Sequence, residues 1–523
     1  MATKEIAIVG GGATGGALLW ALTRDQAQRD AFRPTLFHDE PAYGGHSDTY
    51  FVKFDSVTGK GALTSDMDPG SFAIDIGVQF VCEPVYPNLY QMLKLPEFQG
   101  VTAMALKKHP ELKIASAFRD DVNWGNFPAY QSGPAFAKGY TAAGVKDAEQ
   151  FSEDLRLFDL SWWMSWDIDR YLTHKGVDRT GDFFRYMLVS YLAIINGYGT
   201  DELLTMTKRD LFPIFAKIPL FQHVGPLGSF TKPGLGWDRF EYGAQRWVEG
   251  MIAFAEQRGA TAQTGTHVRR VIPKAQGDKV CVEWVPFAKK DDPSAPVSKA
   301  LFDAVILTTD MDVNGQLLGH AQNPYWHIQD DYVAGWNLMP GLCVIHQDTN
   351  VLSPSLRLQK EDAHFNAYYT WDGNTAGNLF HLPYKLDDTF TTYLMHNVVG
   401  CPAPCYVSMY GVADHARRPD PAKVIFEKKW KHGRWVSTHD MAKKRQLHDI
   451  QGMGNVWFAG NNCTVDSEEG ALIAALALAE RLASFEIPWS DFLAGQTYDF
   501  FAGIMFPSST PATTLAGGAR PLL

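Results

Sequence analysis

The amino-acid sequence predicts an α/β protein with a parallel sheet, and three observations lead to this prediction. Residues 5–9, EIAIV, are a short apolar run typical of a strand buried in a parallel sheet. A glycine-rich turn, GGGATGG, follows, and residues 17–30 then have the apolar spacing of a helix. Residues 34–37, PTLF, are interpreted as the next strand, so these segments together form a strand–helix–strand unit.

Later segments return to this pattern. A helix is expected within residues 236–260, strands at 266–274 and 279–287, and a buried strand at 302–312. Residues 455–462 are interpreted as a strand ending in glycine, and a strong helix follows. We therefore predict a discontinuous domain from residues 1–80, 236–312 and 450–490, an α+β domain from 81–235 and 313–449, and a C-terminal tail from 491–523.

The two insertions that form the second domain have a different composition. Residues 151–172 and 181–198 are rich in aromatic side chains and have helical spacing. Residues 342–352, 365–371 and 389–399 have the composition of strands. We expect this domain to cover a substrate.

Length, charge and cysteine content limit the possible functions. The chain has 523 residues, which suggests two to four domains, and a net charge of −11. It has no long run of Lys and Arg, so nucleic-acid binding is not expected. Six cysteines are too few for a disulfide scaffold. The pair in CPAPC, Cys401 and Cys405, could suggest metal or redox chemistry, but its two prolines favour a plain turn, and no metal site is predicted.

The sequence contains no signal-peptide pattern and no apolar window long enough to cross a membrane, so a cytoplasmic location is expected. Residues 492–507, FLAGQTYDFFAGIMFP, are apolar; we expect them to pack on the body, and contact with a membrane surface or a partner subunit is the alternative. Two polar stretches, residues 290–299 and 508–523, have the composition of disordered chain. The oligomeric state is left open.

The glycine-rich turn carries the first functional signal. Gly10, Gly12 and Gly15 have G-x-G-x-x-G spacing between a strand and a helix. The first glycine allows a tight turn, the second lets the backbone approach a pyrophosphate, and the third lets the helix pack on the sheet. The helix start, with Ala13 and Thr14, offers free N–H groups to phosphates. This pattern predicts a Rossmann-type dinucleotide-binding domain.

A carboxylate that holds a ribose is expected where the second strand ends, but the residue there is His38. Neutral imidazole accepts only one hydrogen bond, so we favour Asp39 over Glu40 as the ribose ligand, and a solvated strand end is the alternative. Beyond this strand, Gly44 and Gly45 would let the chain pass close to a cofactor. His46 would reach a phosphate or lie on the surface.

In combination, three segments resemble the FAD-dependent amine-oxidase and phytoene-desaturase superfamily. They are the glycine turn, GGH-x-x-T at 44–49 and DIGVQFV at 75–81. The segments YPNL, IHQDTNVL and TYLMHN resemble a bacterial subgroup of NAD/FAD-binding proteins within it. The resemblance implies FAD. In addition to the motifs above, the resemblance places several residues at the cofactor. They are Gln79 and Phe80, Val268 at the adenine end, Gly460 and Asn461 after the last strand, and Gly470 and Ala471 at the start of the last helix. His38 and Asn461 depart from the acidic residues usual in the family.

The resemblance also implies an activity. We expect an FAD-dependent oxidoreductase that moves a hydride from a small-molecule substrate, either an amine or an apolar lipid-like molecule, to the flavin. A redox-neutral double-bond isomerase and a non-catalytic flavin-binding protein are the alternatives. Tyr369, Trp371, Tyr393 and His396 are weak candidates for catalytic side chains, because aromatic and histidine residues on such strands also form cores.

Overall fold

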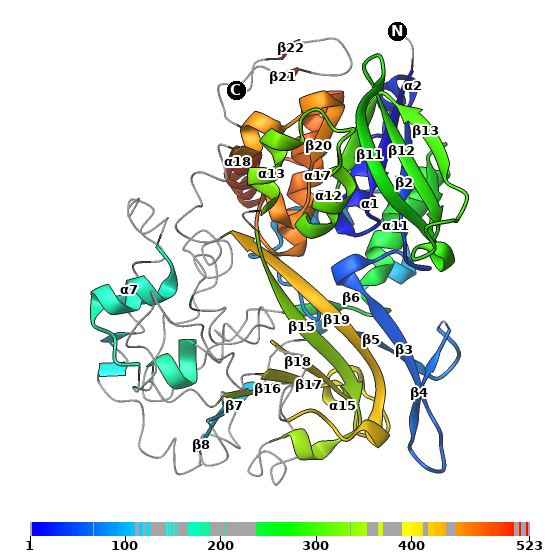
Figure 1. Cartoon of the computed structure of the whole chain (residues 1–523). Coiled ribbons are helices and arrows are strands. Elements are labelled where there is room, and N and C mark those ends of the chain that lie inside the picture. The colour runs from blue at the N-terminus through cyan, green and yellow to red at the C-terminus, as the bar shows by residue number, and fades with distance from the viewer. Residues whose placement is uncertain are drawn as a thin grey trace.

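The computed structural model describes the chain in a parallel-sheet part and an antiparallel-sheet part, which two long strands connect (Figure 1). The described residues are 3–65, 67–109, 114–118, 122–125, 143–144, 146–147, 150–151, 154, 166–179, 181, 183–188, 204, 237–334, 336–352, 365–369, 390–411, 417–435, 446–506, 512–513 and 519–520.

The parallel sheet has five strands in the order β10–β2–β1–β14–β20. These are β1 (Lys4–Val9), β2 (Phe32–Phe37), β10 (Thr261–Gln263), β14 (Ala304–Leu307) and β20 (Val456–Phe458). They come from segments within residues 1–80, 236–312 and 450–490, and the division into domains stays a prediction. The predicted α/β class and parallel sheet are confirmed.

The register brings the ends of four strands together. Val9 pairs with Phe37 on one side and with Leu307 on the other, and Leu307 pairs with Phe458. Because parallel strands share one carboxyl edge, the residues that follow them meet there. This edge is the place where a ligand is expected in such a sheet.

Helices cover one face of this sheet, and a three-stranded meander covers the other. All nine residues of α1 (Ala13–Ala21) are buried, and α1 packs against both α11 (Gln245–Glu256) and α17 (Glu468–Ala483). The helix predicted over residues 17–30 is instead two helices, because Asp25 has an extended backbone and α2 (Gln26–Ala31) begins after it. The meander consists of β11 (Thr266–Gln276), β12 (Lys279–Pro286) and β13 (Ser298–Phe302).

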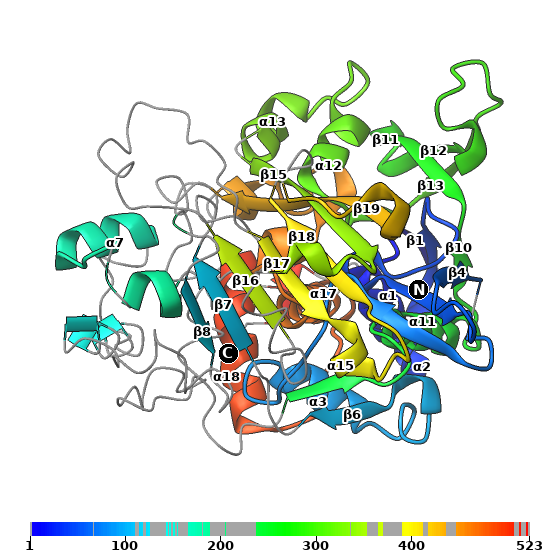
Figure 2. The same cartoon turned by 90° about the horizontal axis from the view of Figure 1, so that it is seen from below.

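The second part is a seven-stranded sheet, seen from below in Figure 2, in the order β19–β15–β18–β17–β16–β7–β8. Its strands are antiparallel except β16 and β7, which run parallel. Their bounds are β7 (Ile114–Phe118), β8 (Val122–Gly125), β15 (Trp336–His346), β16 (Phe365–Tyr369), β17 (Phe390–Leu394), β18 (Tyr406–Tyr410) and β19 (Val424–Trp435).

Two predictions at the border of these parts were wrong. The start of the helix predicted from residue 236 is a strand, β9 (Trp237–Phe240), whose four residues are buried and pair with β6 (Leu106–His109). The strand predicted through residue 399 ends at β17, and α15 (Met395–Val399) follows it. In both places tertiary burial outweighs local composition.

The remaining elements are shorter. They are η1 (Gly45–Ser47), β3 (Thr49–Phe54), β4 (Gly61–Thr64), β5 (Ser71–Asp75), α3 (Pro87–Leu93), η2 (Thr102–Met104), α7 (Ile168–Lys175), the π-helix η4 (Phe183–Leu188), η5 (Phe287–Lys289), α12 (Met311–Leu318), α13 (Trp326–Ala334), η6 (Thr349–Val351), η7 (Pro421–Lys423), η9 (Met453–Asn455), η10 (Asn461–Cys463), α18 (Phe492–Met505), β21 (Ala512–Thr513) and β22 (Ala519–Arg520).

The two segments considered for disorder or membrane contact have definite places in the fold. α18 packs on α17 and α3, as expected for residues 492–507. The loop at 290–299, predicted to be disordered, is held because the guanidinium of Arg269 donates to the carbonyls of Lys289, Lys290 and Asp292. Most of the tail at 508–523 lies outside the described residues.

In the described part of the chain, no helix is both long enough and apolar enough to cross a membrane. All six cysteines are free and buried.

A buried hydrogen-bond junction joins β3, β5 and α11. Asp75 Oδ1 accepts from the Thr49 hydroxyl at 2.6 Å and from the Ala244 N–H at 2.8 Å. The Thr49 hydroxyl oxygen also accepts from the Gln245 N–H at 3.1 Å, so the junction holds the start of α11. Burial raises the pKa of Asp75 from 3.8 to about 6, although Arg239 and these hydrogen bonds oppose the shift.

The substitution Asp75→Asn should remove a pH dependence of stability. Because the folded pKa is raised, this carboxyl contributes stability that is complete below pH 3.8 and is lost as the pH rises through about 6. The shift of roughly two units in the pKa of Asp75 corresponds to about 3 kcal/mol in the free energy of unfolding. Urea titrations at pH 4 and at pH 7 measure this free energy. Between these two pH values the parent should lose about 3 kcal/mol more than D75N does. E83Q, at an exposed carboxylate, should follow the parent.

Candidate functional site

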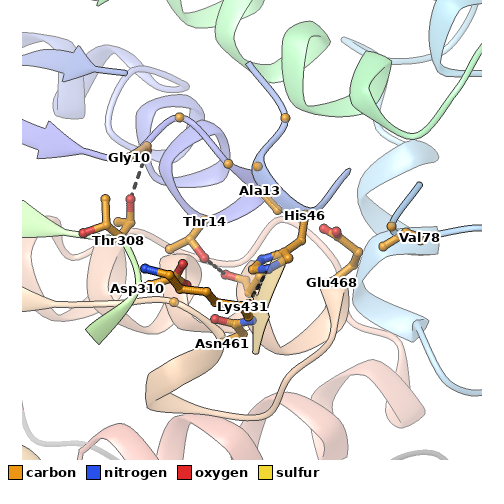
Figure 3. Close-up of a pocket in the computed structure, with 18 of the residues that line it drawn as sticks. Gly10, Ala13, Thr14, His46, Val78, Thr308, Asp310, Lys431, Asn461 and Glu468 are labelled. Carbon is orange, nitrogen blue, oxygen red and sulfur yellow. Dashed lines mark hydrogen bonds between the residues drawn. The ribbon is translucent and has the colours of Figure 1, made fainter. Parts of the chain in front are cut away.

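A cavity of about 500 Å³ lies between the carboxyl edge of the parallel sheet and the antiparallel sheet (Figure 3). This volume is within the range of small-molecule and cofactor sites. We call its two sides the cradle side and the aromatic side. The cradle side is formed by residues 10–14, 38–40, 44–46, 308–310 and 460–461 and by Glu468. The aromatic side is formed by Tyr86, Trp237, Leu342, Cys343, Tyr393, Met409 and Tyr410.

The glycine turn of the cradle side has no room for side chains. Gly10 has φ +118°, and a Cβ there would lie 2.5 Å from the Thr308 hydroxyl oxygen. A Cβ on Gly15 would lie 1.9 Å from the Gly10 carbonyl oxygen. Gly12 forms a bridge with Gly44, and as the N-cap of α1 it gives no side-chain hydrogen bond to the helix start. The helix therefore presents N–H groups to the cavity, a place suited to anionic groups.

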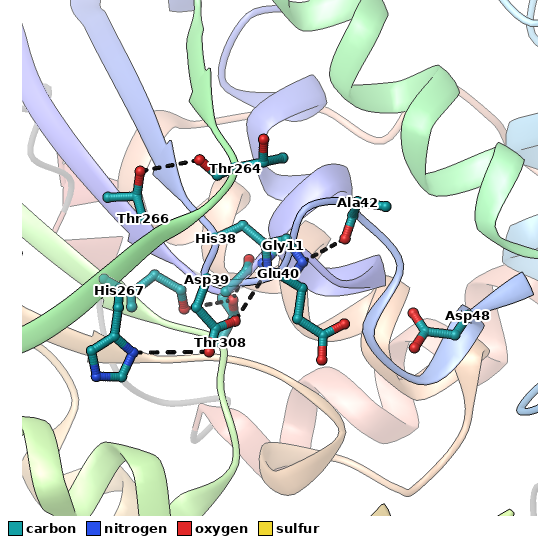
Figure 4. A network of polar contacts seen from close by, with 12 residues as sticks. Gly11, His38, Asp39, Glu40, Ala42, Asp48, Thr264, Thr266, His267 and Thr308 are labelled. Carbon is teal, nitrogen blue, oxygen red and sulfur yellow. Dashed lines mark hydrogen bonds and ion pairs between the residues drawn. The ribbon is translucent and has the colours of Figure 1, made fainter. Parts of the chain in front are cut away.

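His38 is part of the scaffold of the cradle side (Figure 4). Its Nδ1 accepts from the Gly11 N–H at 3.2 Å, and its Nε2 donates to the Ala42 carbonyl at 2.8 Å. These two bonds assign the proton to Nε2 and leave the ring neutral, so the 3.9 Å approach of Asp39 to Nδ1 is not an ion pair. Both ring nitrogens are used within the protein, and neither remains for a ribose.

Asp39 and Glu40 differ in their partners. Glu40 contacts Lys428 Nζ at 3.0 Å, and Lys428 also binds Asp48. Asp39 is half exposed at 49%, and its closest polar neighbours among the described residues are His38 and His267, the latter at 4.0 Å. The Asp39 carboxylate is therefore available to a ligand in the cavity, whereas Glu40 is held by a lysine from β19.

His46 lies among acidic side chains. Its Nε2 donates to the Lys431 carbonyl at 3.1 Å. Burial alone would lower the pKa of His46, but the charges of Asp310, Asp466 and Glu468, together with that carbonyl, raise it above 6.5. His46 is thus held toward its cationic form, which suits contact with a phosphate.

Glu468 and its neighbours form the start of α17. Ser467 caps this helix, and its hydroxyl accepts from the Gly470 N–H at 3.0 Å. Glu469 accepts from the N–H groups of Asn88 and Leu89 and so holds the start of α3. Glu468 turns to the cavity instead, where its Oε1 accepts from the Ser47 hydroxyl at 2.7 Å.

The aromatic side offers a different environment. The seven residues that define it carry no charged side chain, and burial raises the pKa of Tyr393, which keeps its hydroxyl protonated. The Trp237 side chain is buried, and its Nε1 has no hydrogen-bond partner among the described residues. This side is therefore suited to an apolar or planar ligand.

The fold is shared with solved structures of two oxidases and an isomerase. A CLA-producing fatty acid isomerase from P. acnes matches with a TM-score of 0.58 and 14% identity, over 91% of this chain and 98% of that chain. A protein from Exiguobacterium sp. 255-15 described as a protoporphyrinogen oxidase matches with a TM-score of 0.55 and 13% identity, over 93% and 100%. Putrescine oxidase bound to putrescine matches with a TM-score of 0.54 and 12% identity, over 91% and 98%.

The chain shares its fold with these three enzymes. The resemblance inferred from the sequence motifs is thereby confirmed at the level of the fold. No protein-family model and no curated protein sequence matches the chain.

The cradle side fits FAD. In this fold the glycine turn and the start of α1 provide N–H groups for a pyrophosphate, and the close approach of Gly12 and Gly44 leaves no side chain in the way. Asp39 lies just after the end of β2, where a ribose would be held. Its carboxylate accepts no hydrogen bond from the described residues.

Most residues predicted at the cofactor do line the cavity. They are Gly10, Gly12, Ala13, Thr14, His38, Asp39, Gly44, Gly45, His46, Gln79, Phe80, Val268, Gly460, Asn461 and Ala471. Five of them are also engaged within the protein. The hydrogen bonds of His38 and His46 are described above, Thr14 donates to the Ala471 carbonyl, Gln79 donates to the Asp75 carbonyl, and Asn461 donates to Asp466 at 2.6 Å. Their contacts with a cofactor stay predictions.

Three predicted residues lie away from the cavity. Gly15 packs against the Gly10 carbonyl, and the N–H of Gly470 is used by the Ser467 cap. His396 lies in α15, where its Nδ1 contacts the backbone of Cys405, and burial lowers its pKa. Tyr393 does line the cavity. Trp371 and the side chain of Tyr369 lie outside the described residues.

Several lining residues were missed by sequence reasoning. Thr308 contacts the carbonyls of Val9 and Gly10 at 2.9 Å, and its signal was its place directly after a buried strand. Glu468 lies two residues before Gly470, which was predicted at the cofactor, and an acid in the first turn of the helix was the available signal. Lys428 and Trp237 gave no signal, because their neighbours in the cavity are distant in sequence.

The substitution His38→Ala should destabilise the protein without removing a ligand contact. It leaves the buried Gly11 N–H unpaired and removes a buried ring, and we expect a loss of about 2–4 kcal/mol in the free energy of unfolding. His267→Ala is the matched control, because His267 is partly exposed and has no hydrogen bond from its ring to the described residues. That variant should change stability by less than about 0.5 kcal/mol in the same urea titration.

Proposed function

We propose that the protein is an FAD-dependent oxidoreductase that acts on a small organic substrate. The observation that carries this proposal is that one cavity joins a dinucleotide cradle to an uncharged aromatic side. FAD supplies hydride acceptance at its flavin ring when it is bound. The cradle side would hold the cofactor, and the aromatic side would hold the substrate against it.

The chain's own residues would provide position and exclusion of water. The Thr14 hydroxyl donates to the Ala471 carbonyl at 3.0 Å and ties the starts of α1 and α17 together. The buried rings of Tyr393 and Tyr410 keep the aromatic side dry. Holding reactants in a fixed geometry without water is a large part of what flavin dehydrogenation needs from a protein.

The substrate class is proposed from the same lining. Among the lining residues, charged side chains belong to the cradle side, to its border and to β19, where Lys428 and Lys429 pair with Cys343 and Leu342, and the seven residues of the aromatic side carry none. This arrangement favours an apolar or planar substrate over a diamine. It also supports a second candidate, a redox-neutral isomerase of a double bond in an apolar substrate, as the solved isomerase of this fold acts on a fatty acid.

Flavin release and anaerobic reduction test these proposals. Purified protein should be yellow and should release FAD on denaturation. Under anaerobic conditions a substrate of the oxidoreductase should bleach the bound flavin lastingly, and a substrate of the isomerase should bleach it at most transiently. A flavin that no apolar or amine substrate bleaches would point to a non-catalytic protein, and a colourless protein that fails to bind added FAD would refute the cofactor.

Asp39→Ala should weaken FAD binding, and Glu40→Ala should largely spare it. The Asp39 carboxylate lines the cavity and accepts no hydrogen bond from the described residues, with His267 at 4.0 Å, whereas Glu40 is paired with Lys428. Loss of charge-assisted hydrogen bonds to a ribose should raise the FAD dissociation constant roughly 10–100-fold. Flavin fluorescence quenching in titrations of the apoprotein measures both constants. Equal effects of the two substitutions would contradict the assignment of Asp39.

A further inference from the structure

Glu468 is a buried acid with one oxygen unused. It is 5% exposed, and it lines the cavity from the first turn of α17. Its Oε1 accepts from the Ser47 hydroxyl at 2.7 Å. Its Oε2 is buried and has no hydrogen-bond partner among the residues that the structure describes. A buried polar atom without a partner is costly, so a bound ligand is the natural partner for this oxygen.

Several charged and titratable groups face Glu468. Glu468 interacts electrostatically with His46 of η1, with Asp466 in the loop before α17 and with Tyr86 on the aromatic side. Asp310 and Lys431 lie beyond it around His46, as Figure 3 shows. Glu469, the next residue of the helix, points to α3 instead. Glu468 therefore stands where the cradle side meets the aromatic side.

The surroundings favour the neutral acid. Burial raises the pKa of Glu468 from 4.5 to about 7, Ser47 and His46 oppose this shift, and Asp466 adds to it. A carboxylate at a helix start is ordinarily stabilised in its charged form by the helix dipole, but without water around Oε2 that gain is outweighed. Only the neutral acid carries an O–H that can donate a hydrogen bond.

We propose that Glu468 binds the dinucleotide cofactor as a neutral acid, with Oε2–H donating to an acceptor atom of FAD, so that cofactor binding takes up a proton near neutral pH. This proposal rests on the proposed function, because it takes FAD as the ligand. The two phosphates of FAD add negative charge to the cradle side, which further favours the protonated acid. No electrons move: one O–H bond forms at Glu468, and the proton comes from solvent.

The test is the pH dependence of FAD affinity in the apoprotein. If only the form with protonated Glu468 binds, the FAD dissociation constant at one pH unit above the pKa of Glu468 in the FAD-free protein is about tenfold higher than at low pH. We expect this rise between pH 6 and pH 8.5 in the parent. Glu468→Gln carries an amide that donates at every pH, so E468Q should show a smaller rise than the parent over this range.

Two further variants and a second readout separate the possible outcomes. E480Q makes the same substitution on the same helix, at a residue that accepts from the Tyr498 hydroxyl and does not line the cavity, so it should follow the parent. H46Q should bind more weakly but keep the pH slope, because Glu468 remains. Calorimetry in two buffers with different ionisation enthalpies should show proton uptake in the parent and less in E468Q.

Other results would overturn the proposal. They are an equal pH slope in the parent and E468Q, a slope lost in H46Q but kept in E468Q, or a folded E468Q that binds no FAD at any pH. Failure of the parent itself to bind FAD would refute the cofactor as well. The failure of this inference is thus distinguishable from the failure of the proposed function.

Discussion

The register of the parallel sheet is the constraint on which the rest of the structure depends. It places the residues after β1, β2, β14 and β20 at one edge, and every part of the cradle side is built on that edge. A one-residue slip would move each side chain to the opposite face of the sheet. Thr308 links two of these strand ends through its contacts with Val9 and Gly10, and His38 links a third to the glycine turn.

Motif residues that signal a cofactor fold serve partly to hold the protein together. Thr49 and Asp75 belong to the two segments that resemble the superfamily, yet they bind each other and the start of α11 rather than lining the cavity. His38 stands where a ribose ligand was expected and is used up by Gly11 and Ala42. Some residues of a motif that signals a cofactor fold therefore hold the scaffold together and do not themselves line the cavity.

The electrostatics of the cavity follow from its two unlike sides. The cradle side gathers acids and bases within reach of one another. Burial shifts the pKa of Glu468 upward, whereas burial lowers the pKa of His46 and the nearby acids raise it in spite of that. The aromatic side has no comparable charges. A ligand with a polar, anionic part and a flat or apolar neighbour matches this division, which is the combination that FAD and an apolar substrate would present.

The sequence by itself determined the α/β class, the positions along the chain of β1, β2, β14 and β20, the glycine turn and most of the residues that line the cradle side, because these depend on local periodicity and on the conformational demands of glycine. It did not indicate β10, the edge strand of the parallel sheet. It misjudged β9 and α15, whose burial outweighs their composition. Only the tertiary structure decided that Lys428 holds Glu40 and that Ser47 binds Glu468, which lies 421 residues away along the chain. The proton preference of Glu468 depends on desolvation by such distant neighbours, and no local pattern encodes it.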